Sequence, residues 1–178
     1  MRYVALALIV AAGLWAVGCG KSKSDSNTPA QVPGGSTMDR KVLIETTQGP
    51  FTAEIFGDVK VSSANFLHLV ESGFYNGLVF HRYVPGFVIQ GGDPKGDGSG
   101  GSDKTIPLEI TDHKHVKGAL GMARTQDPNS ASSQFYVCLD DAHNLDGQYC
   151  VFGQVVEGMD NVLKLRQGDK MTKVTILP

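Results

Sequence analysis

The stretch FHRYVPGFVIQGGD, from Phe80 to Asp93, decides the fold of this 178-residue chain. Its centre, Pro85-Gly86, predicts a tight turn, because proline fixes one backbone angle and glycine adopts conformations that other residues avoid. Aromatic and β-branched residues on both sides of the turn favour extended chain. We therefore expect two short strands, near residues 79–83 and 87–90, the second ending in a Gly-Gly pair.

Three side chains of this stretch are suited to binding or catalysis. The hairpin brings a cation (Arg82), a carboxamide (Gln90) and an aromatic ring (Phe87) close together. Later segments supply a second set of apolar and amide groups: Gly121-Met122-Ala123-Arg124, Ser133-Gln134-Phe135-Tyr136 and Leu145-Asp146-Gly147-Gln148-Tyr149.

Outward from the hairpin, the pattern predicts more short strands and two helices. Residues 51–55 alternate apolar and polar side chains, as a half-buried strand does. Ser62 or Ser63 is expected to cap a helix that ends before Gly73. The apolar face of that helix would be Phe66, Leu67 and Val70. Further strands are expected at 119–124, 134–138, 150–156 and 172–177, with a second helix at 160–166, which together suggest a closed barrel with helical caps.

Length and composition fit one globular domain and exclude some partners. The chain is too short for two ordinary domains, and its 22 glycines favour strands with tight turns over a helical bundle. The net charge is −2, with 16 basic and 18 acidic side chains interspersed. Because no basic stripe is present to neutralise phosphates, nucleic acid is not an expected partner.

The N-terminal residues have the pattern of an export signal. Arg2 precedes an apolar run over residues 4–17, which is short for a membrane-spanning helix but fits the core of a signal peptide. The run ends in Ala16-Val17-Gly18-Cys19, which resembles the lipobox of bacterial lipoproteins. That resemblance implies a signal peptide over 1–18 and a lipid anchor on Cys19. The alternatives are an ordinary secretory signal with an incidental cysteine, and an uncleaved anchor.

Residues 19–39 are expected to tether a folded domain of residues 40–178. The tether is rich in Ser, Gly, Pro, Asn and Lys, and it has too little apolar surface to offset the entropy of ordering. We expect the protein in the cell envelope, on a membrane facing the periplasm. Gly20 follows the cysteine in place of aspartate, which resembles cargo for the outer membrane if the host has one.

In this order and spacing, the segments around Arg82 resemble the cyclophilin family of peptidyl-prolyl cis-trans isomerases. The similarity runs from about Lys41 to the C-terminus, and residues 80–93 are its most specific part. The resemblance implies a mainly-β fold, a closed eight-stranded antiparallel β-barrel capped by two α-helices. It also implies a monomer that binds proline-containing polypeptides and needs neither cofactor nor metal.

The reaction that this resemblance implies sets a clear chemical demand. Rotation about an X-Pro bond is slow because amide resonance must be broken, a barrier of roughly 18–20 kcal/mol. An enzyme has only to bind the twisted amide better than the planar isomers, with no covalent intermediate. The twisted proline nitrogen accepts a hydrogen bond, and by resemblance the permanently charged Arg82 supplies it.

The resemblance also gives roles to the neighbours of Arg82. Gln90 matches the residue that positions the arginine, and Phe87 completes the catalytic set. The apolar pocket for the proline ring would comprise Phe87, Val88, Tyr136 and Leu145, with Tyr149 at its rim. Positions along the substrate groove are His81, Ala123, Arg124, Gln134 and Asn144.

The sequence departs from the family pattern at three of these positions. Val88 occupies a position where Met is common, and Tyr136 one where Phe is common, so the pocket shape is expected to differ. Asn144 aligns with a position that is Trp in cyclosporin-sensitive members, and loss of the indole removes both contact area and an N–H donor. We therefore expect isomerase activity with weak cyclosporin sensitivity.

Structural interpretations compete with some of these assignments. Taken alone, Arg82 could be a surface arginine and Gln90 a strand-end cap. His113 and His115 are one residue apart, but no further ligands follow at a spacing that suits a metal, so a loop or strand-edge pair is expected. The glycine-rich run 91–101 lacks the Lys-Ser/Thr ending of a phosphate-binding loop and is expected to be a surface loop.

The remaining cysteines and the function itself leave alternatives open. Cys138 and Cys150 could form a disulfide in an oxidising compartment, but their apolar surroundings favour buried thiols. The leading function is a proline isomerase that assists the folding of exported polypeptides. The alternatives are a chaperone module that binds proline peptides without turnover, and a purely structural lipoprotein.

Overall fold

The computed structural model describes residues 38–178. The predicted signal peptide, Cys19 and nearly all of the predicted tether lie outside these residues. Within the described part of the chain, no helix is both long and apolar enough to cross a membrane.

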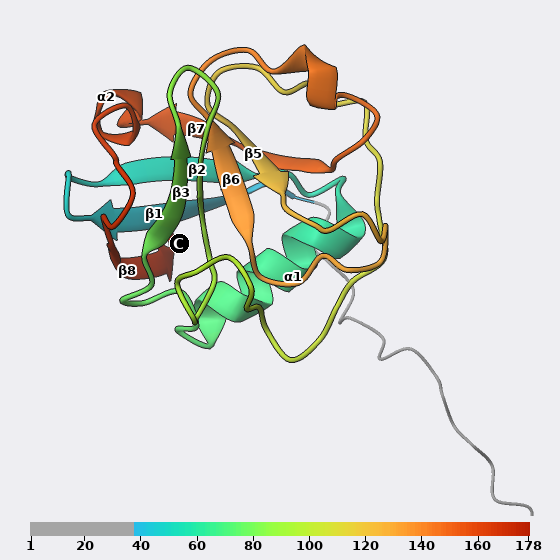
Figure 1. The fold of residues 1–178 in the computed structure, drawn as a ribbon, viewed down its shortest axis with the longest axis horizontal. Helices are drawn as coiled ribbons and strands as arrows, with labels where there is room; N and C mark the ends of the chain where they lie inside the picture. Colours follow the sequence, from blue (N-terminus) through green and yellow to red (C-terminus); the bar gives the residue numbers. More distant parts are fainter. Residues whose placement is uncertain (1–37) are drawn as a thin grey trace, which may run out of the picture. The chain divides into compact units, whose positions relative to one another are not determined.

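One curled antiparallel sheet of eight strands makes up most of the domain (Figure 1). Its strands, in chain order, are β1 (Arg40–Thr46), β2 (Phe51–Ile55), β3 (Phe80–Val84), β4 (Val88–Gly91), β5 (Ala119–Met122), β6 (Phe135–Cys138), β7 (Val151–Glu157) and β8 (Met171–Ile176). In space the order is β3-β4-β6-β5-β7-β2-β1-β8. Helix α1 (Lys60–Glu71) and the short helix α2 (Met159–Val162) lie at opposite sides of the curled sheet, and a 3-10 turn, η1, spans His143–Leu145.

The mainly-β fold with two helices is as predicted, but the strand ladder does not close into a barrel. β3 and β8 remain at the two ends of the sheet order. Main-chain hydrogen bonds join the first residue of each of these strands to the segment that precedes the other strand. The N–H of Phe80 in β3 donates to the carbonyl of Asp169 (2.8 Å), and the N–H of Met171 in β8 donates to the carbonyl of Leu78 (2.9 Å). A few bonds between the ends of an open curled sheet thus stand in place of a continuous ladder.

Both faces of the sheet are buried in its central strands. Ile89 and Val137 face the main core inside the curl, where α1 contributes Phe66. Alternate residues of the same strands, including Val88 and Tyr136, face a smaller outer cluster. This two-residue alternation follows from strand geometry, in which successive side chains point to opposite faces.

Helix α1 starts earlier than predicted and is capped from outside. Ser62 and Ser63 are buried within the helix, and its N-cap residue, Val59, provides no side-chain cap. Instead, the Glu109 carboxylate accepts main-chain N–H groups from Lys60 (2.8 Å), Val61 (3.0 Å) and Ser62 (2.9 Å). A remote carboxylate therefore satisfies the free donors that a helix N-terminus leaves.

The other predicted elements agree with the structure to within a few residues at their ends. The second helix is shorter than the predicted 160–166, because α2 ends at Val162 and a turn follows it. Strand β1 was not among the predicted strands. At the end of α1, Gly73 adopts a positive φ of 72°, and the N–H groups of Gly73 and Phe74 bond back to Val70 and Leu69. The predicted glycine stop is therefore correct.

We predict that Glu109→Ala lowers the free energy of unfolding by about 1 kcal/mol, because three helix N–H groups lose their acceptor. Urea unfolding followed by circular dichroism measures the change. Glu71→Ala, at the other end of α1, is the control: it removes a carboxylate that has no capping role. Equal losses in the two variants would contradict a capping role for Glu109.

Candidate active site

One row of residues across four strands forms the frame of the site. Arg82 of β3 lies opposite Gln90 of β4, Gln90 lies opposite Tyr136 of β6, and Tyr136 lies opposite Gly121 of β5. Residues paired in this way project from the same face of a sheet. Four positions that are far apart in the sequence therefore meet on the outer face.

A chain of hydrogen bonds holds the Arg82 guanidinium at the end of this row. Arg82 Nη1 donates to Gln90 Oε1 (3.2 Å), and Gln90 Nε2 donates to Gln134 Oε1 (2.9 Å). Gln134 Nε2 in turn donates to the carbonyls of Gly98 (2.9 Å) and Gly100 (2.7 Å). Because each amide uses its oxygen on one side and its nitrogen on the other, the orientation of both carboxamides is fixed.

The loop at the far end of this chain is ordered by Asp93. This side chain is 1% exposed and accepts N–H groups from Lys95 (2.8 Å) and Gly98 (2.6 Å). Burial alone would raise the pKa of Asp93, but these N–H groups outweigh it and lower the pKa, so the group is a carboxylate. Gly100 is required here, since a Cβ on it would overlap the Asp93 carboxylate.

A cavity of about 280 Å³ lies beside the row. Its walls are Arg82, Phe87, Val88, Gln90, Ala123, Arg124, Tyr136, Leu145 and Tyr149. Apolar side chains form most of this wall, and the exposed guanidinium of Arg82 stands at one side. A second cavity of about 340 Å³ adjoins it through Gln90, Ala123 and Arg124 and continues to the loop at Gly98. Together they suit an extended peptide that places one small apolar ring in the first cavity.

Comparison with known proteins gives this arrangement a family. Residues 41–177 match the family model described as cyclophilin type peptidyl-prolyl cis-trans isomerase. The chain belongs to the cyclophilin family. A peptidyl-prolyl cis-trans isomerase of Synechococcus elongatus is 41% identical over 140 residues, which cover 77% of this chain and 96% of the relative.

Solved structures of the family agree with the fold of this cyclophilin. A cyclophilin type peptidyl-prolyl cis-trans isomerase of Cryptosporidium parvum has a TM-score of 0.72 and 28% identity, covering 79% of this chain and 99% of the other. The same Cryptosporidium protein, solved in the presence of the dipeptide Ala-Pro, has a TM-score of 0.71 and 29% identity, covering 78% and 99%.

The cavity contains only residues that the sequence had singled out, but three of those predicted do not line it. Gln134 lines the adjoining cavity. His81 is the extra residue of a bulge between Phe80 and Arg82, and its ring lies beside Gly98; burial there lowers the pKa of His81. Asn144 is exposed on η1, outside both cavity linings.

Arg124 and Tyr149 form one side of the rim in this cyclophilin. The guanidinium carbon of Arg124 lies 4.7 Å from the centre of the Tyr149 ring. Arg124 also donates to the carbonyls of Gln148 (2.9 Å) and Thr125 (2.8 Å). A cation–π contact and two hydrogen bonds thus keep both side chains in place.

His113 and His115, expected to be a loop or strand-edge pair, lie in the loop before β5 and have separate environments. His113 is partly exposed, stacks on Phe56 with ring centres 4.1 Å apart, and pairs with Asp58 (3.0 Å). His115 is completely buried, and its ring joins Asp146 to the hydroxyl of Tyr136. Within residues 38–178, no group of His, Cys, Asp or Glu could hold a metal ion.

His115 and Asp146 contact the cavity lining from behind, a role that the sequence did not indicate. No local motif marks them, since His115 and Tyr136 are 21 positions apart and come together only through the fold.

Cys138 and Cys150 are free, buried thiols on opposite faces of the sheet. Cys138 belongs to the outer cluster and Cys150 to the main core. Burial raises the pKa of both thiols to about 12, which leaves little reactive thiolate at neutral pH. The favoured interpretation of the sequence, buried thiols, is confirmed.

Proposed function

We propose that the cavity beside Arg82 is where this cyclophilin accelerates rotation about X-Pro bonds, and that its substrates are exported polypeptides. The observation that carries the proposal is the series of hydrogen bonds that connects Arg82, through Gln90 and Gln134, to the carbonyl of Gly100. It sets a cation with a fixed orientation at the edge of an apolar cavity.

Arg82 would act on the proline nitrogen as the amide twists. In the planar amide this nitrogen shares its lone pair with the carbonyl and is a poor acceptor. As the bond rotates, the lone pair localises and accepts a hydrogen bond from the guanidinium. Because this bond is strongest at the top of the barrier, it lowers the barrier and does not merely tighten binding. Holding Arg82 in advance avoids the cost of ordering a long side chain during the reaction.

The apolar wall would hold the proline ring while the preceding residue turns. Phe87 and Leu145 are half-buried in the cavity, and Tyr136 is 5% exposed at its floor. Such side chains would bind the proline ring equally well in the cis and trans peptide. They would hold the ring in place, and Arg82 would favour the twisted amide over both planar isomers. The Cryptosporidium relative solved in the presence of Ala-Pro supports this class of ligand.

We predict that Arg82→Ala lowers kcat/KM on a short X-Pro peptide by roughly 100-fold or more, the usual loss for one donor aimed at a transition state. A protease-coupled isomerisation assay measures it. Arg40→Ala, at the start of β1 and outside the cavity lining, is the matched control and keeps the native rate.

The same assay separates turnover from binding alone. If native protein and Arg82→Ala both give the uncatalysed rate, the enzyme proposal fails. NMR titration with the same peptide then distinguishes the two alternatives, since a chaperone module binds the peptide and a structural lipoprotein does not.

Asn144 bears on inhibitor binding rather than on turnover. It is exposed on η1, lines neither cavity, and lacks both the large ring and the indole N–H of a tryptophan. We predict weak inhibition by cyclosporin, together with normal isomerase activity, in the coupled assay. Nanomolar inhibition would contradict the prediction.

We further propose that Cys19 carries the lipid that attaches the protein to the cell envelope. The motif Ala16-Val17-Gly18-Cys19 after an apolar run supports it, and the polar residues that follow would give the domain reach above the membrane. Intact mass of the membrane-extracted protein should show cleavage before Cys19 and added acyl chains, and Cys19→Ser should lose them. An unmodified mass, or the full-length chain, would contradict the anchor.

A further inference from the structure

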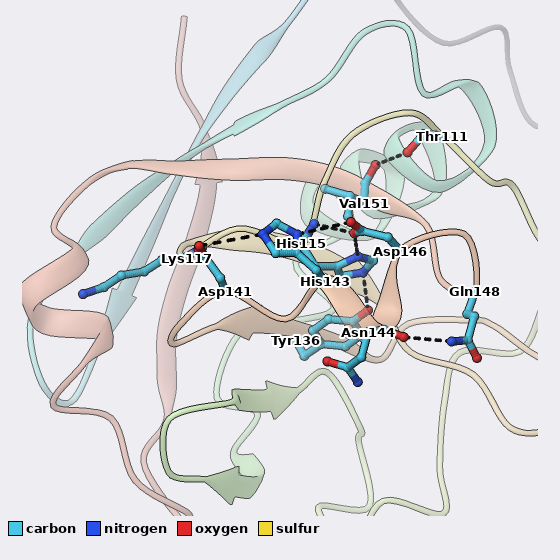
Figure 2. A network of polar contacts seen from close by, with 10 residues as sticks. All are labelled: Thr111, His115, Lys117, Tyr136, Asp141, His143, Asn144, Asp146, Gln148 and Val151. Carbon is cyan, nitrogen blue, oxygen red and sulfur yellow. Dashed lines mark hydrogen bonds and ion pairs between the residues drawn. The ribbon is translucent and has the colours of Figure 1, made fainter.

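A buried histidine lies directly behind the pocket floor. His115 is 0% exposed, and its Nε2 lies 2.9 Å from the hydroxyl oxygen of Tyr136. Its Nδ1 lies 2.8 Å from Asp146 Oδ1 on the other side of the ring. Figure 2 shows the three side chains in line, Tyr136 to His115 to Asp146. A buried polar chain of this kind needs an explanation, because each member costs stability unless it is fully paired.

Both ring nitrogens of His115 have a hydrogen-bond partner, and the charge of Asp146 indicates which nitrogen carries the proton. The main-chain and ring N–H groups of His115 lower the pKa of Asp146 to about 2, so Asp146 is a carboxylate and Nδ1 of His115 is the donor to it. In neutral His115 the other nitrogen, Nε2, is then an acceptor. Burial raises the pKa of Tyr136, so its hydroxyl keeps its proton and can donate to Nε2 of this tautomer.

The Tyr136 ring is also confined from below. Gly121, its partner across β5 and β6, leaves space for the ring, because a Cβ at that position would overlap the Cζ and hydroxyl of Tyr136. The Tyr149 ring lies nearly perpendicular to the Tyr136 ring, with centres 6.3 Å apart and planes at 82°. Packing therefore holds the Tyr136 ring, and the hydrogen bond to His115 holds its hydroxyl.

His115 holds the opposite wall of the pocket as well. The N–H of Ala142, just before η1, donates to the carbonyl of His115 (2.7 Å). Asp146, just after η1, accepts the main-chain N–H of His115 (2.9 Å) and, through its other oxygen, pairs with His143 Nδ1 (3.2 Å). η1 carries Leu145, so both of its ends are tied to the residue that holds Tyr136.

We infer that His115 and Asp146 are positioning residues of this cyclophilin, which set the Tyr136 floor and the Leu145 wall at the separation that a proline ring fills. The inference rests on the proposed use of the cavity and adds two residues that touch no substrate. Because they shape a wall that binds both isomers, their loss weakens peptide affinity and leaves the rate of isomerisation in the bound state nearly unchanged.

A double-mutant cycle tests this inference. In His115→Asn the side-chain amide can still donate to Asp146, but nothing reaches the Tyr136 hydroxyl; Tyr136→Phe removes the hydroxyl itself. Each single change is expected to raise the Kd for an X-Pro peptide roughly threefold to tenfold, the worth of about one hydrogen bond. The double variant is expected to lie within about twofold of Tyr136→Phe, because both changes break the same link. NMR titration gives the Kd, and exchange spectroscopy gives the bound-state rate.

A matched control lies two residues away. His113→Asn also removes a histidine that pairs with a carboxylate, but His113 lies outside the cavity lining, so Kd should not change. Should His115→Asn fail to fold, Tyr136→Phe and Asp146→Asn form a second cycle that leaves the buried ring in place. Additive effects on Kd in the cycle, or a native Kd in every single variant, would overturn the inference.

Titration of the native protein with the same peptide tests the proposed function separately from the positioning role. If the peptide does not shift the NMR signals of Tyr136 and Leu145, the cavity is not the proline site, and the proposed function and this inference both fail. If the native protein binds and isomerises the peptide but the cycle is additive, only the positioning role fails.

Discussion

The register of β4 between β3 and β6 is the constraint on which the site depends. It sets Arg82, Gln90 and Tyr136 in one row, and it is enforced from the other face, where Ile89 and Val137 are 0% exposed in the main core. A slip by one residue would move Gln90 into that core and Ile89 out to the face that carries the cavity. Exposing these core residues and burying a carboxamide would cost several kcal/mol, so the packing of the core fixes the geometry of the outer face.

Two side chains that line the cavity, Arg82 and Tyr136, are held from outside it by polar contacts. Arg82 is exposed and would sample many rotamers, but Gln90 and Gln134 connect it to loop carbonyls, and Asp93 orders that loop. On the other side of the row, the buried chain through His115 reaches Tyr136. In both cases the conformational entropy is lost on folding rather than on binding, which is how a preformed site gains affinity and rate.

Much of this arrangement was predictable because it is local. The alternation of apolar residues and the Pro85-Gly86 turn indicate the hairpin, and every residue that lines the first cavity stands in a segment that resembles the cyclophilin signature. What could not be predicted depends on contacts between distant residues. Glu109 lies 49 positions from Lys60 and accepts its main-chain N–H. The sequence around Ser62 gives no sign that this distant carboxylate, rather than a local serine, caps α1. The open ladder between β3 and β8 likewise depends on how far the sheet curls.

His115 shows why a side chain can be noticed in the sequence and still be misplaced. The spacing of His113 and His115 suggests one face of a strand, but the chain there forms no strand, so the two rings diverge. One ring stacks on Phe56 near solvent and the other enters the outer cluster. The cluster admits a polar ring only because Tyr136 and Asp146 satisfy both nitrogens. Phenylalanine in place of Tyr136 would leave the buried Nε2 without its partner, so at this position the hydroxyl and the histidine depend on one another. The hydroxyl of Tyr136, at a position that the family resemblance predicts to be phenylalanine, is therefore accounted for by the buried histidine behind it.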